Sequence, residues 1–310
     1  MYPTIIRAKF RRGHNGLALN SGLLLAALLL ALPSTARGAN LYESDADTGN
    51  IYEFTPAGVQ SIFASGLNRP EGLAFDSSGN LYEADYGSGR IYKFTPGGVK
   101  STFASGLNEP VGLAFDASGN LFETDHSTTG GGRIYKFTLA GVQSTFASGL
   151  NSPGGLGFDS GGNLFETNFG SEDIDEFTPS EIQSTFASGL NGPGALAFDS
   201  SGNLFETNFG SEDIDEFTPA GIQSTFASGL NGPAGIAFDS SGNLYETDYY
   251  SDRIYKFTSG GVKSAFASGL NGPLFLAFSP VPEPSTLLLA VLNSVSLPLV
   301  LRRCRRARRR

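Results

Sequence analysis

The segment 72–110, GLAFDSSGNLYEADYGSGRIYKFTPGGVKSTFASGLNEP, is repeated along most of the chain. The phenylalanine that ends its LAF element occurs at intervals of 40, 43, 40, 40 and 40 residues, as Phe75, Phe115, Phe158, Phe198, Phe238 and Phe278. A period of this length is typical of propellers and solenoids, in which each repeat is one small unit that packs on its neighbours. No other feature of the sequence limits the fold as strongly.

Each repeat has the features of four short β-strands. The GLAF run is apolar, NLYEAD follows it, RIYKF is rich in β-branched and aromatic residues, and KSTFAS completes the unit. The turns between them contain Gly, which adopts positive φ, with Asp, Asn or Pro beside it. Four antiparallel strands in about 40 residues describe one propeller blade. The sequence therefore predicts an all-β fold, a six-bladed β-propeller of four-stranded blades.

The strands are permuted along the chain relative to the blades. The repeats begin at Asn40 with a second strand and finish with a first strand, FLAF, at 275–278. A closed ring needs its last edge joined to its first, because an open edge strand leaves backbone groups unpaired. We therefore expect the C-terminal strand 275–278 to join the N-terminal blade, built from residues 40–66. A solenoid would need capping repeats at both ends, and none is visible in the sequence.

The repeated pattern P-x-G-[LI]-A-F-D-x-x-G-N-L-[YF], followed by A-D or T-D and R-I-Y-K-F, resembles the NHL-type six-bladed propellers. It is also similar to two related groups of propellers, the gluconolactonase/regucalcin-like enzymes and the virginiamycin B lyases. The resemblance covers about residues 40–279 and implies the propeller fold for that region. For activity, it implies a metal-dependent lactonase or a lyase as one alternative.

Charge is distributed unevenly along the chain. The formal net charge is −9, but residues 40–279 contain nine basic and 29 acidic residues, a net charge of about −20. An acidic field of this size excludes nucleic acid as an expected partner, since phosphate binding needs basic surface. The only cysteine is Cys304, outside the repeats, so packing rather than disulfides must hold a monomeric propeller together.

Residues 1–39 have the features of a secretory signal peptide. The basic residues Arg7, Lys9, Arg11 and Arg12 precede the apolar run GLLLAALLLAL at 22–32, and small residues at 36–39 offer cleavage positions. The apolar run is too short to span a bilayer easily, and the charge order and Pro33 argue against a buried core helix. We expect the protein to be exported.

The C-terminal segment 280–310 has three parts in a fixed order. The motif VPEPST, which contains Pro282, Glu283 and Pro284, precedes the apolar stretch LLLAVLNSVSLPLVL and the cluster RRCRRARRR. This order resembles the PEP-CTERM sorting signal, with its motif, short transmembrane helix and arginine-rich end. The resemblance implies an exosortase-type processing enzyme, an inner-membrane intermediate, and delivery to the outer surface or the extracellular space. The arginines would hold the tail on the cytoplasmic side, which we favour over a nucleic-acid patch.

Ligands of propellers usually bind where the central channel opens on one face. The loops that precede the first strands and those that follow the second strands share that face, so both supply candidate ligand or metal residues. The candidates are Glu71 with Asp45, Asp85, Asp125, Asn168, Asn208 and Asp248. Such oxygen ligands suit a divalent cation such as calcium. Alternatively, each Asp or Asn caps its own turn, as a position repeated in every blade would.

Two residues differ from the repeat where an enzyme would need them. Glu71, in RPEGLAF, stands where the lactonase-like family has a metal-binding glutamate, but most other repeats have a small or apolar residue there. His126, beside the insertion STTGGG, is the only candidate for the acid–base histidine of the lyases, and histidine titrates in a suitable range. Near-identical repeats leave little room for an asymmetric catalytic arrangement, so the sequence favours a protein that is not an enzyme.

Two sets of acidic residues are unusual. Glutamates stand on the second strands where a blade interior normally has apolar residues: Glu43, Glu83, Glu123, Glu166, Glu206 and Glu246. A buried charge needs a partner, and Lys93, Lys136 and Lys256 are the available ones in three blades. In blades four and five, SEDIDEF replaces SGRIYKF, which predicts a solvated acidic face or, alternatively, a site for a cation or a basic partner.

The sequence as a whole predicts an exported, surface-sorted propeller that acts as a binding or matrix-associated protein, with exopolysaccharide as the expected partner. The sorting signal supports this, and so do Tyr86, Phe169, Phe209 and Tyr249, which follow second strands beside Asp85 and Asp248. Aromatic faces with polar neighbours can hold extended ligands. The alternative is a metal-dependent lactonase or a lyase.

Overall fold

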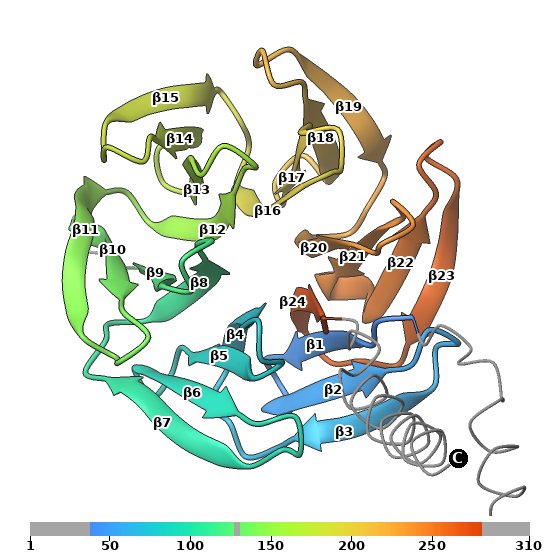
Figure 1. Ribbon diagram of the computed structural model, residues 1–310. Coiled ribbons are helices and arrows are strands. Elements are labelled where there is room, and N and C mark those ends of the chain that lie inside the picture. Colours follow the sequence, from blue (N-terminus) through green and yellow to red (C-terminus); the bar gives the residue numbers. More distant parts are fainter. Residues whose placement is uncertain (1–37, 127–130, 281–310) are drawn as a thin grey trace, which may run out of the picture. The chain divides into compact units, whose positions relative to one another are not determined.

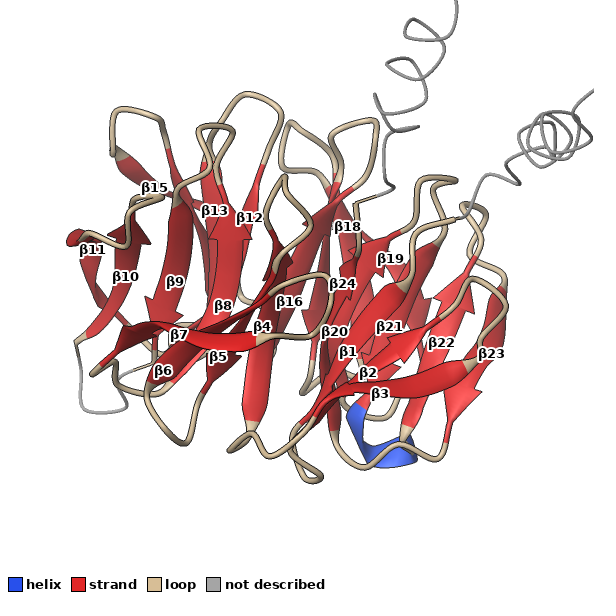
Figure 2. Ribbon diagram, turned by 60° about the horizontal axis from the view of Figure 1, so that its bottom comes forward, coloured by secondary structure: helices blue, strands red, loops and turns tan. Residues whose placement is uncertain are grey.

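The computed structural model describes residues 38–126 and 131–280, which form a β-propeller (Figure 1). Six antiparallel sheets of four strands are arranged in a ring, as the repeat predicts. The first strand of each repeat lies next to the axis, and the fourth strand forms the outer edge. Figure 2 shows the strands running between two faces that carry the loops. The predicted fold class is therefore confirmed.

We number the blades in chain order. Blade 1 contains β24 (Pro273–Phe278), β1 (Leu41–Asp45), β2 (Asn50–Phe54) and β3 (Gln60–Ala64). Blade 2 contains β4 (Pro70–Phe75), β5 (Leu81–Asp85), β6 (Arg90–Phe94) and β7 (Lys100–Ser105). Blade 3 contains β8 (Pro110–Phe115), β9 (Leu121–Asp125), β10 (Gly132–Phe137) and β11 (Gln143–Leu150).

The remaining blades follow the same order. Blade 4 contains β12 (Pro153–Phe158), β13 (Leu164–Asn168), β14 (Asp173–Phe177) and β15 (Gln183–Ser188). Blade 5 contains β16 (Pro193–Phe198), β17 (Leu204–Asn208), β18 (Asp213–Phe217) and β19 (Gln223–Ser228). Blade 6 contains β20 (Pro233–Phe238), β21 (Leu244–Asp248), β22 (Arg253–Phe257) and β23 (Lys263–Ser268), with the short 3-10 helix η1 (Tyr249–Ser251) between β21 and β22.

The C-terminal strand closes the ring as predicted. β24 pairs antiparallel with β1, so that Leu41 lies opposite Phe278. The backbone N–H of Ser279 donates to the carbonyl of Asn40 (2.9 Å), and the N–H of Asn40 donates to the Ser279 hydroxyl (3.0 Å). The strand begins at Pro273, two residues before the predicted start. Blade 1 thus joins both ends of the repeat region.

Neighbouring blades touch through their innermost strands. A Cβ added at Gly72 would lie 2.1 Å from the carbonyl oxygen of Val111 in the next blade, which leaves room for no side chain. The Thr124 hydroxyl accepts from the N–H of Gly112 and donates to the carbonyl of Gly154, both at 2.7 Å, and so bridges blades 3 and 4. These close contacts position the strand ends that surround the channel.

The hydrophobic core lies between the blades. The ring of Tyr82 packs edge-on against Phe103 of its own blade and Phe115 of the next, with centroids 5.0 Å apart in both pairs. Phe165 makes the same two contacts with Phe186 and Phe198. Such pairs add about 0.5–1.5 kcal/mol each beyond the burial of their area. The core therefore repeats with the sequence.

The turn between the first and second strands is held by its aspartate. In blade 2, Asp76 Oδ1 accepts the backbone N–H groups of Ser78 (2.9 Å) and Asn80 (2.8 Å). Burial alone would raise the pKa of Asp76, but these hydrogen bonds and the Lys93 charge lower it below its usual value. The predicted hairpin turn is confirmed.

The lysines of the third strands do not pair with the second-strand glutamates. Lys93 Nζ lies 3.6 Å from Asp76 Oδ2, and Lys256 Nζ lies 3.5 Å from Asp239 Oδ2. The reason is the register of the sheet. Lys93 lies opposite Tyr82, and the side chains of Tyr82 and Glu83 point to opposite faces. The predicted lysine–glutamate pairs are therefore wrong.

One glutamate per blade is buried against the neighbouring blade. We call Glu43, Glu83, Glu123, Glu166, Glu206 and Glu246 the inter-blade glutamates; each is 0% exposed. Their carboxyl oxygens have no hydrogen-bond partner among the described residues. Burial raises the pKa of each far above its usual value, and nearby aspartates raise it further; at Glu166 and Glu206 a neighbouring backbone N–H partly offsets this. The structure favours the neutral acid at these positions.

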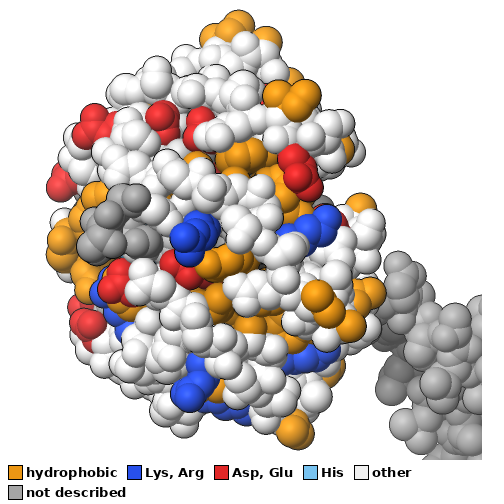
Figure 3. Space-filling view, turned by 90° about the vertical axis from the view of Figure 1, so that its left-hand side faces the viewer, with side chains coloured by type: hydrophobic (Ala, Val, Ile, Leu, Met, Phe, Trp, Pro, Cys, Tyr) orange, Lys and Arg blue, Asp and Glu red, His pale blue; other side chains and the backbone are white. Residues whose placement is uncertain are grey.

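The outer surface mixes side chains of all kinds. Acidic, basic and hydrophobic side chains are interspersed on the side of the propeller in Figure 3. Among the residues described, none forms a helix with the length and apolar character that a membrane crossing requires. The predicted signal peptide and sorting segment, with Pro282, Glu283 and Pro284, lie almost wholly outside the described residues, so both stay predictions.

Candidate functional site

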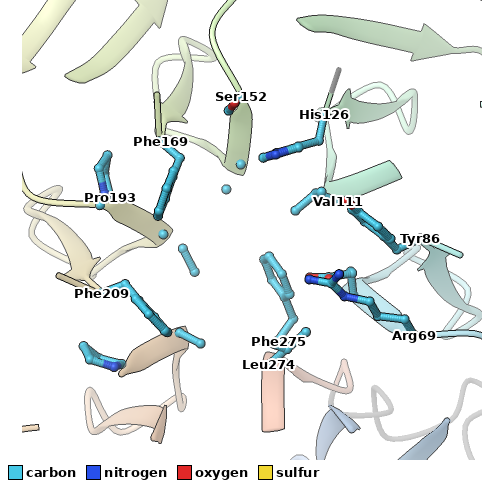
Figure 4. Close-up of a pocket in the computed structure, with 18 residues that line it drawn as sticks. Arg69, Tyr86, Val111, His126, Ser152, Phe169, Pro193, Phe209, Leu274 and Phe275 are labelled. Carbon is cyan, nitrogen blue, oxygen red and sulfur yellow. The ribbon is translucent and has the colours of Figure 1, made fainter. Parts of the chain in front are cut away.

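A cavity of about 220 Å³ opens at the mouth of the central channel (Figure 4). Its lining comes from the starts of the innermost strands, such as Glu71 and Leu274, and from residues directly after the second strands, such as Tyr86, His126 and Phe169. The expectation that these two sets of positions share one face is confirmed. The ring of blades therefore brings residues from the whole repeat region to one place.

The two sides of the mouth differ in chemistry. The polar side contains Arg69, Glu71, Tyr86, His126 and Ser152, from blades 2 to 4, with one apolar residue, Val111, among them. The apolar side consists of Phe169, Pro193, Phe209, Ala234, Leu274 and Phe275, from blades 4 to 6 and blade 1. Figure 4 shows Arg69 and Phe169 on opposite sides of the cavity. The mouth is asymmetric although the repeats are nearly identical.

The residue before the first-strand proline has a left-handed backbone in every blade. The φ angles are 57° at Arg69, Glu109 and Ser152, 69° at Gly192, 74° at Gly232 and 73° at Gly272. Glycine adopts this conformation freely, whereas other residues incur on the order of 1–2 kcal/mol of strain. Blades 2 to 4 tolerate that strain, and two of their side chains, Arg69 and Ser152, line the cavity. Backbone strain at such a position is typical of functional sites.

Arg69 and Glu71 form an ion pair on the polar side. Arg69 Nε donates to Glu71 Oε1 at 3.0 Å, and the guanidinium lies over the Tyr86 ring, 4.3 Å from its centroid. The side chain of Arg69 is 55% exposed, but that of Glu71 is only 7% exposed. Glu71 and Tyr86 therefore orient the arginine, whose charge is the one a ligand would meet.

Burial changes the protonation of this group. Burial raises the pKa of Glu71 to about 7, although the charge and hydrogen bond of Arg69 lower it. Burial also raises the pKa of Tyr86 to about 12, and both a hydrogen bond to Glu109 and the negative charge of Glu109 add to this rise. Glu71 thus titrates near neutral pH, while the Tyr86 hydroxyl keeps its proton.

Aromatic side chains extend the apolar side beyond the cavity. The ring centroid of Phe209 lies 5.5 Å from that of Tyr250 and 6.4 Å from that of Tyr249. Phe169 is 49% exposed and Tyr250 61% exposed. Large exposed rings in contact with one another form a platform for an apolar or flat ligand surface.

The six Asp and Asn candidates lie behind the mouth and do not line the cavity. Asp45, Asp85, Asp125, Asn168, Asn208 and Asp248 are at most 6% exposed. Each accepts a backbone N–H from the loop before the first strand of its blade; Asp85 Oδ2, for example, accepts from Asn68 at 2.9 Å. Asp85 also caps its own turn, accepting from Ser88 at 3.1 Å. These bonds support a structural role in which each side chain ties two loops together. The sequence analysis predicted the capping of the turn but not the bond to the second loop.

This donor set does not fit the divalent cation that the lactonase resemblance implies. The Asp and Asn oxygens bond backbone N–H groups, and Glu71 bonds Arg69, so these residues do not converge on one point. Within 38–126 and 131–280, no group of three or more His, Cys, Asp or Glu side chains is placed to hold a metal ion. The carboxylates that the sequence placed beside the aromatic rim, Asp85 and Asp248, are likewise buried.

His126 lies on the polar side of the mouth. Its backbone N–H donates to the carbonyl of Glu109 at 3.2 Å, and Figure 4 shows its ring between Val111 and Ser152. His126 and Glu71 line the same cavity, so the structure brings the two enzyme candidates together.

The acidic pair of blades is only partly a solvated face. Asp175 is 6% exposed and accepts from Asn168 (3.0 Å), Gln183 (2.8 Å) and Thr185 (3.2 Å). Asp215 makes the equivalent bonds in blade 5. These two aspartates therefore fasten the third strand to the strands on either side of it.

No protein-family model and no curated protein matches the chain. Solved structures do match it. A chain from the crystal structure of a nidogen/laminin complex is 22% identical, with a TM-score of 0.71 over 79% of this chain and 99% of that one. A gluconolactonase from Xanthomonas campestris is 16% identical, with a TM-score of 0.63 over 80% of this chain and 94% of that one.

A virginiamycin B lyase from Staphylococcus aureus is also similar. It is 16% identical, with a TM-score of 0.57 over 77% of this chain and 81% of that one. At such identities the similarity shows the propeller fold alone, because one fold hosts many activities. The chain thus has structural neighbours among the propellers that its sequence resembles, and its activity must be argued from its own residues.

Proposed function

We propose that the protein is an exported binding protein whose channel mouth holds a glycan of the extracellular matrix. The observation that carries this proposal is the asymmetric mouth, with hydrogen-bonding side chains on one side and exposed aromatic rings on the other. A sugar ring has the matching chemistry, since it presents hydroxyl groups at its edge and C–H groups on its faces. Aromatic side chains bind such apolar faces through their large contact area.

The size of the cavity favours one sugar-sized unit. Its volume of about 220 Å³ lies below the roughly 300–1,000 Å³ of pockets that enclose drug-sized ligands. A terminal or side-chain residue of a polysaccharide would enter the mouth, and the rest of the polymer would lie outside it. The adjoining rings of Phe209, Tyr249 and Tyr250 would contact the next unit.

Two further observations support binding over catalysis. The buried Asp and Asn residues are engaged with the backbone and supply no free acid or base at the mouth. A chain matched over 99% of its length comes from the crystal structure of a nidogen/laminin complex, that is, from a protein bound to another protein. The predicted signal peptide and sorting segment would deliver the propeller to the surface where matrix glycans lie.

The proposal is tested by retention of the full-length protein on extracellular polysaccharide from the organism that makes it. We expect the wild-type protein to be retained and the double variant Phe169→Ala/Phe209→Ala to pass through. The double variant Val99→Ala/Val142→Ala, which changes exposed side chains away from the mouth, is the matched control. Equal retention of wild type and the aromatic variant would refute glycan binding at the mouth.

A lyase or lactonase activity is the second candidate. It is favoured by one observation, that Glu71 titrates near neutral pH in the cavity that His126 also lines. A carboxyl group that gains and loses its proton near pH 7 is suited to general acid–base catalysis. A panel of lactones and cyclic esters should then be turned over by wild type but not by Glu71→Gln/His126→Gln, and turnover that survives in the double variant would remove this candidate.

A further inference from the structure

We propose that the mouth selects a glycan unit that carries a carboxylate, such as a hexuronic acid, and that Arg69 binds that carboxylate. This inference rests on the proposed function and adds the chemical class of the ligand. Among the described residues that line the cavity, Arg69 is the only lysine or arginine. Its planar guanidinium matches a carboxylate in geometry, because both can form two parallel hydrogen bonds.

The arrangement of charge favours an anion at this point. Glu71 lies beneath Arg69, with 7% of its side chain exposed against 55% for the arginine. The charge that an incoming group meets is therefore positive. Nε is engaged with Glu71, so the two terminal nitrogens of the guanidinium are the ones placed to meet a ligand.

Two contacts and the backbone conformation hold Arg69 in place before any ligand binds. The left-handed backbone (φ 57°) directs its side chain over the mouth, the hydrogen bond to Glu71 fixes the guanidinium at 3.0 Å, and the Tyr86 ring supports it from one face. A pre-oriented side chain loses little conformational freedom on binding, which strengthens the interaction. Figure 4 shows the guanidinium directed toward the interior of the cavity.

The pair is specific to one blade. Where blade 2 has Arg69 and Glu71, blade 5 has Gly192 and Gly194, and blade 6 has Gly232 and Ala234. Both departures from the repeat therefore occur in the same loop and bond each other. A purely structural loop needs neither residue, because the other blades form it without them.

The acidic surface limits the ligand to isolated carboxylates. Residues 40–279 carry a net charge of about −20, which repels a chain with many closely spaced anionic groups. A single acidic unit whose apolar face packs on Phe169 and Phe209 avoids most of this repulsion. The ligand class is thus a glycan with occasional acidic residues rather than a polyanion.

The test compares two probes that differ only in the carboxylate, 4-methylumbelliferyl β-glucuronide and 4-methylumbelliferyl β-glucoside. Binding of each to the full-length protein is measured by isothermal titration calorimetry at low ionic strength. We expect the glucuronide to bind tighter by roughly tenfold or more, since hydrogen bonds to charged groups are stronger than neutral ones. The preference should weaken as salt is added.

Arg69→Gln should abolish the preference, because it removes the charged group that distinguishes the two probes. Arg69→Lys, which keeps the charge without the planar fork, should retain part of it. The matched control is Arg90→Gln, which removes an exposed arginine of the same blade that does not line the cavity. Thermal melting of each variant confirms that it is folded.

The results separate this inference from the proposed function. Equal affinity for the two probes, or a preference that persists in Arg69→Gln, would refute selection by Arg69 and leave glycan binding intact. Absence of binding for both probes and for matrix polysaccharide would overturn both proposals. Tighter binding of the glucuronide that is lost in Arg69→Gln would establish the inference even if the protein is not retained on matrix polysaccharide.

Discussion

Buried glutamates occur in two regions of this propeller, and the two regions differ in symmetry and in hydrogen bonding. The inter-blade glutamates recur in all six blades, are 0% exposed and have no hydrogen-bond partner among the described residues. Glu71 occurs once, at the channel mouth, where it bonds an exposed arginine. Burial raises the pKa of both kinds, but only Glu71 is held near neutrality by a neighbouring cation.

The difference shows how repeat symmetry separates scaffold from site. A residue that recurs in each blade serves the contact between blades, since that contact also recurs. A ligand, by contrast, meets all blades at one mouth, and distinguishing its ends requires residues that differ between blades. Arg69, Glu71 and His126 meet this condition, and the inter-blade glutamates do not.

The largest predicted effect concerns the inter-blade glutamates and pH. Their pKa values in the folded state lie well above the usual value of 4.5. Their contribution to the free energy of unfolding is therefore fully present below pH 4.5 and is lost as the pH rises through their folded-state pKa values. The free energy of unfolding, measured in urea, should fall from pH 5 to pH 8.

A variant and an opposing group sharpen this prediction. Glu83→Gln should reduce the slope with pH, whereas Glu172→Gln, at an exposed turn, should leave it unchanged. The pKa values of Asp76 and Asp239 are lowered in the folded state, so their contribution to the free energy of unfolding is lost only at more acidic pH. They therefore do not affect the slope between pH 5 and pH 8. A stability that is constant or rises between pH 5 and pH 8 would show that these glutamates are ionised in the fold.

Asn168 should behave as part of the scaffold although the sequence makes it a site candidate. Asn168→Ala removes the part-buried bond from the Asn151 N–H and the buried bond to Asp175, and should cost about 1–3 kcal/mol of unfolding free energy. Ligand affinity should not change. Ser171→Ala, at an exposed hydroxyl, is the control and should stay within about 0.5 kcal/mol of wild type.

Phe169 should show the reverse behaviour. Phe169→Ala should weaken glycan binding by roughly two- to tenfold, through loss of the aromatic contact. Its unfolding free energy should remain within about 0.5 kcal/mol of wild type, because the side chain is 49% exposed. Ile182→Ala, at an exposed turn away from the mouth, should change neither quantity. A large loss of stability in Phe169→Ala would place this residue in the scaffold.

The smallest effect is a pH dependence of binding. Glu71 has a pKa of about 7, so below this pH it becomes neutral and Arg69 gains net attraction for an anion. The affinity for the glucuronide should rise a few-fold from pH 8 to pH 6. In Glu71→Gln this affinity should depend less on pH. The groups whose charges interact with that of Glu71 are Arg69, Glu83, Tyr86 and Tyr249, and His126 lines the same cavity. An unchanged pH profile in Glu71→Gln would show that the protonation of Glu71 does not cause the effect.

The fold was predictable because the period and the turn residues are local signals. The spacing of Phe75 and its equivalents predicts the blades, and the terminal FLAF strand predicts the closure. The partners of Lys93 were not predictable, because they depend on cross-strand register, which a single repeat does not reveal.

The site was predictable only in part. Glu71 and His126 break the repeat, and both line the cavity. The Asp and Asn residues were candidates by position, but their orientation depends on backbone N–H groups 17 residues away in the chain. Arg69 was missed as a ligand-binding residue, although the change from N-G-P to N-R-P before the first strand was a visible signal.

The central claim, that function lies in the side chains that line the mouth rather than in the buried positions that recur in every blade, is tested most directly by one binding measurement. The full-length wild type and the triple variant Arg69→Gln/Phe169→Ala/Phe209→Ala are titrated with 4-methylumbelliferyl β-glucuronide by calorimetry. The account predicts binding by the wild type, no detectable binding by the triple variant, and equal unfolding free energies within about 1 kcal/mol. Equal binding by the two proteins would contradict it.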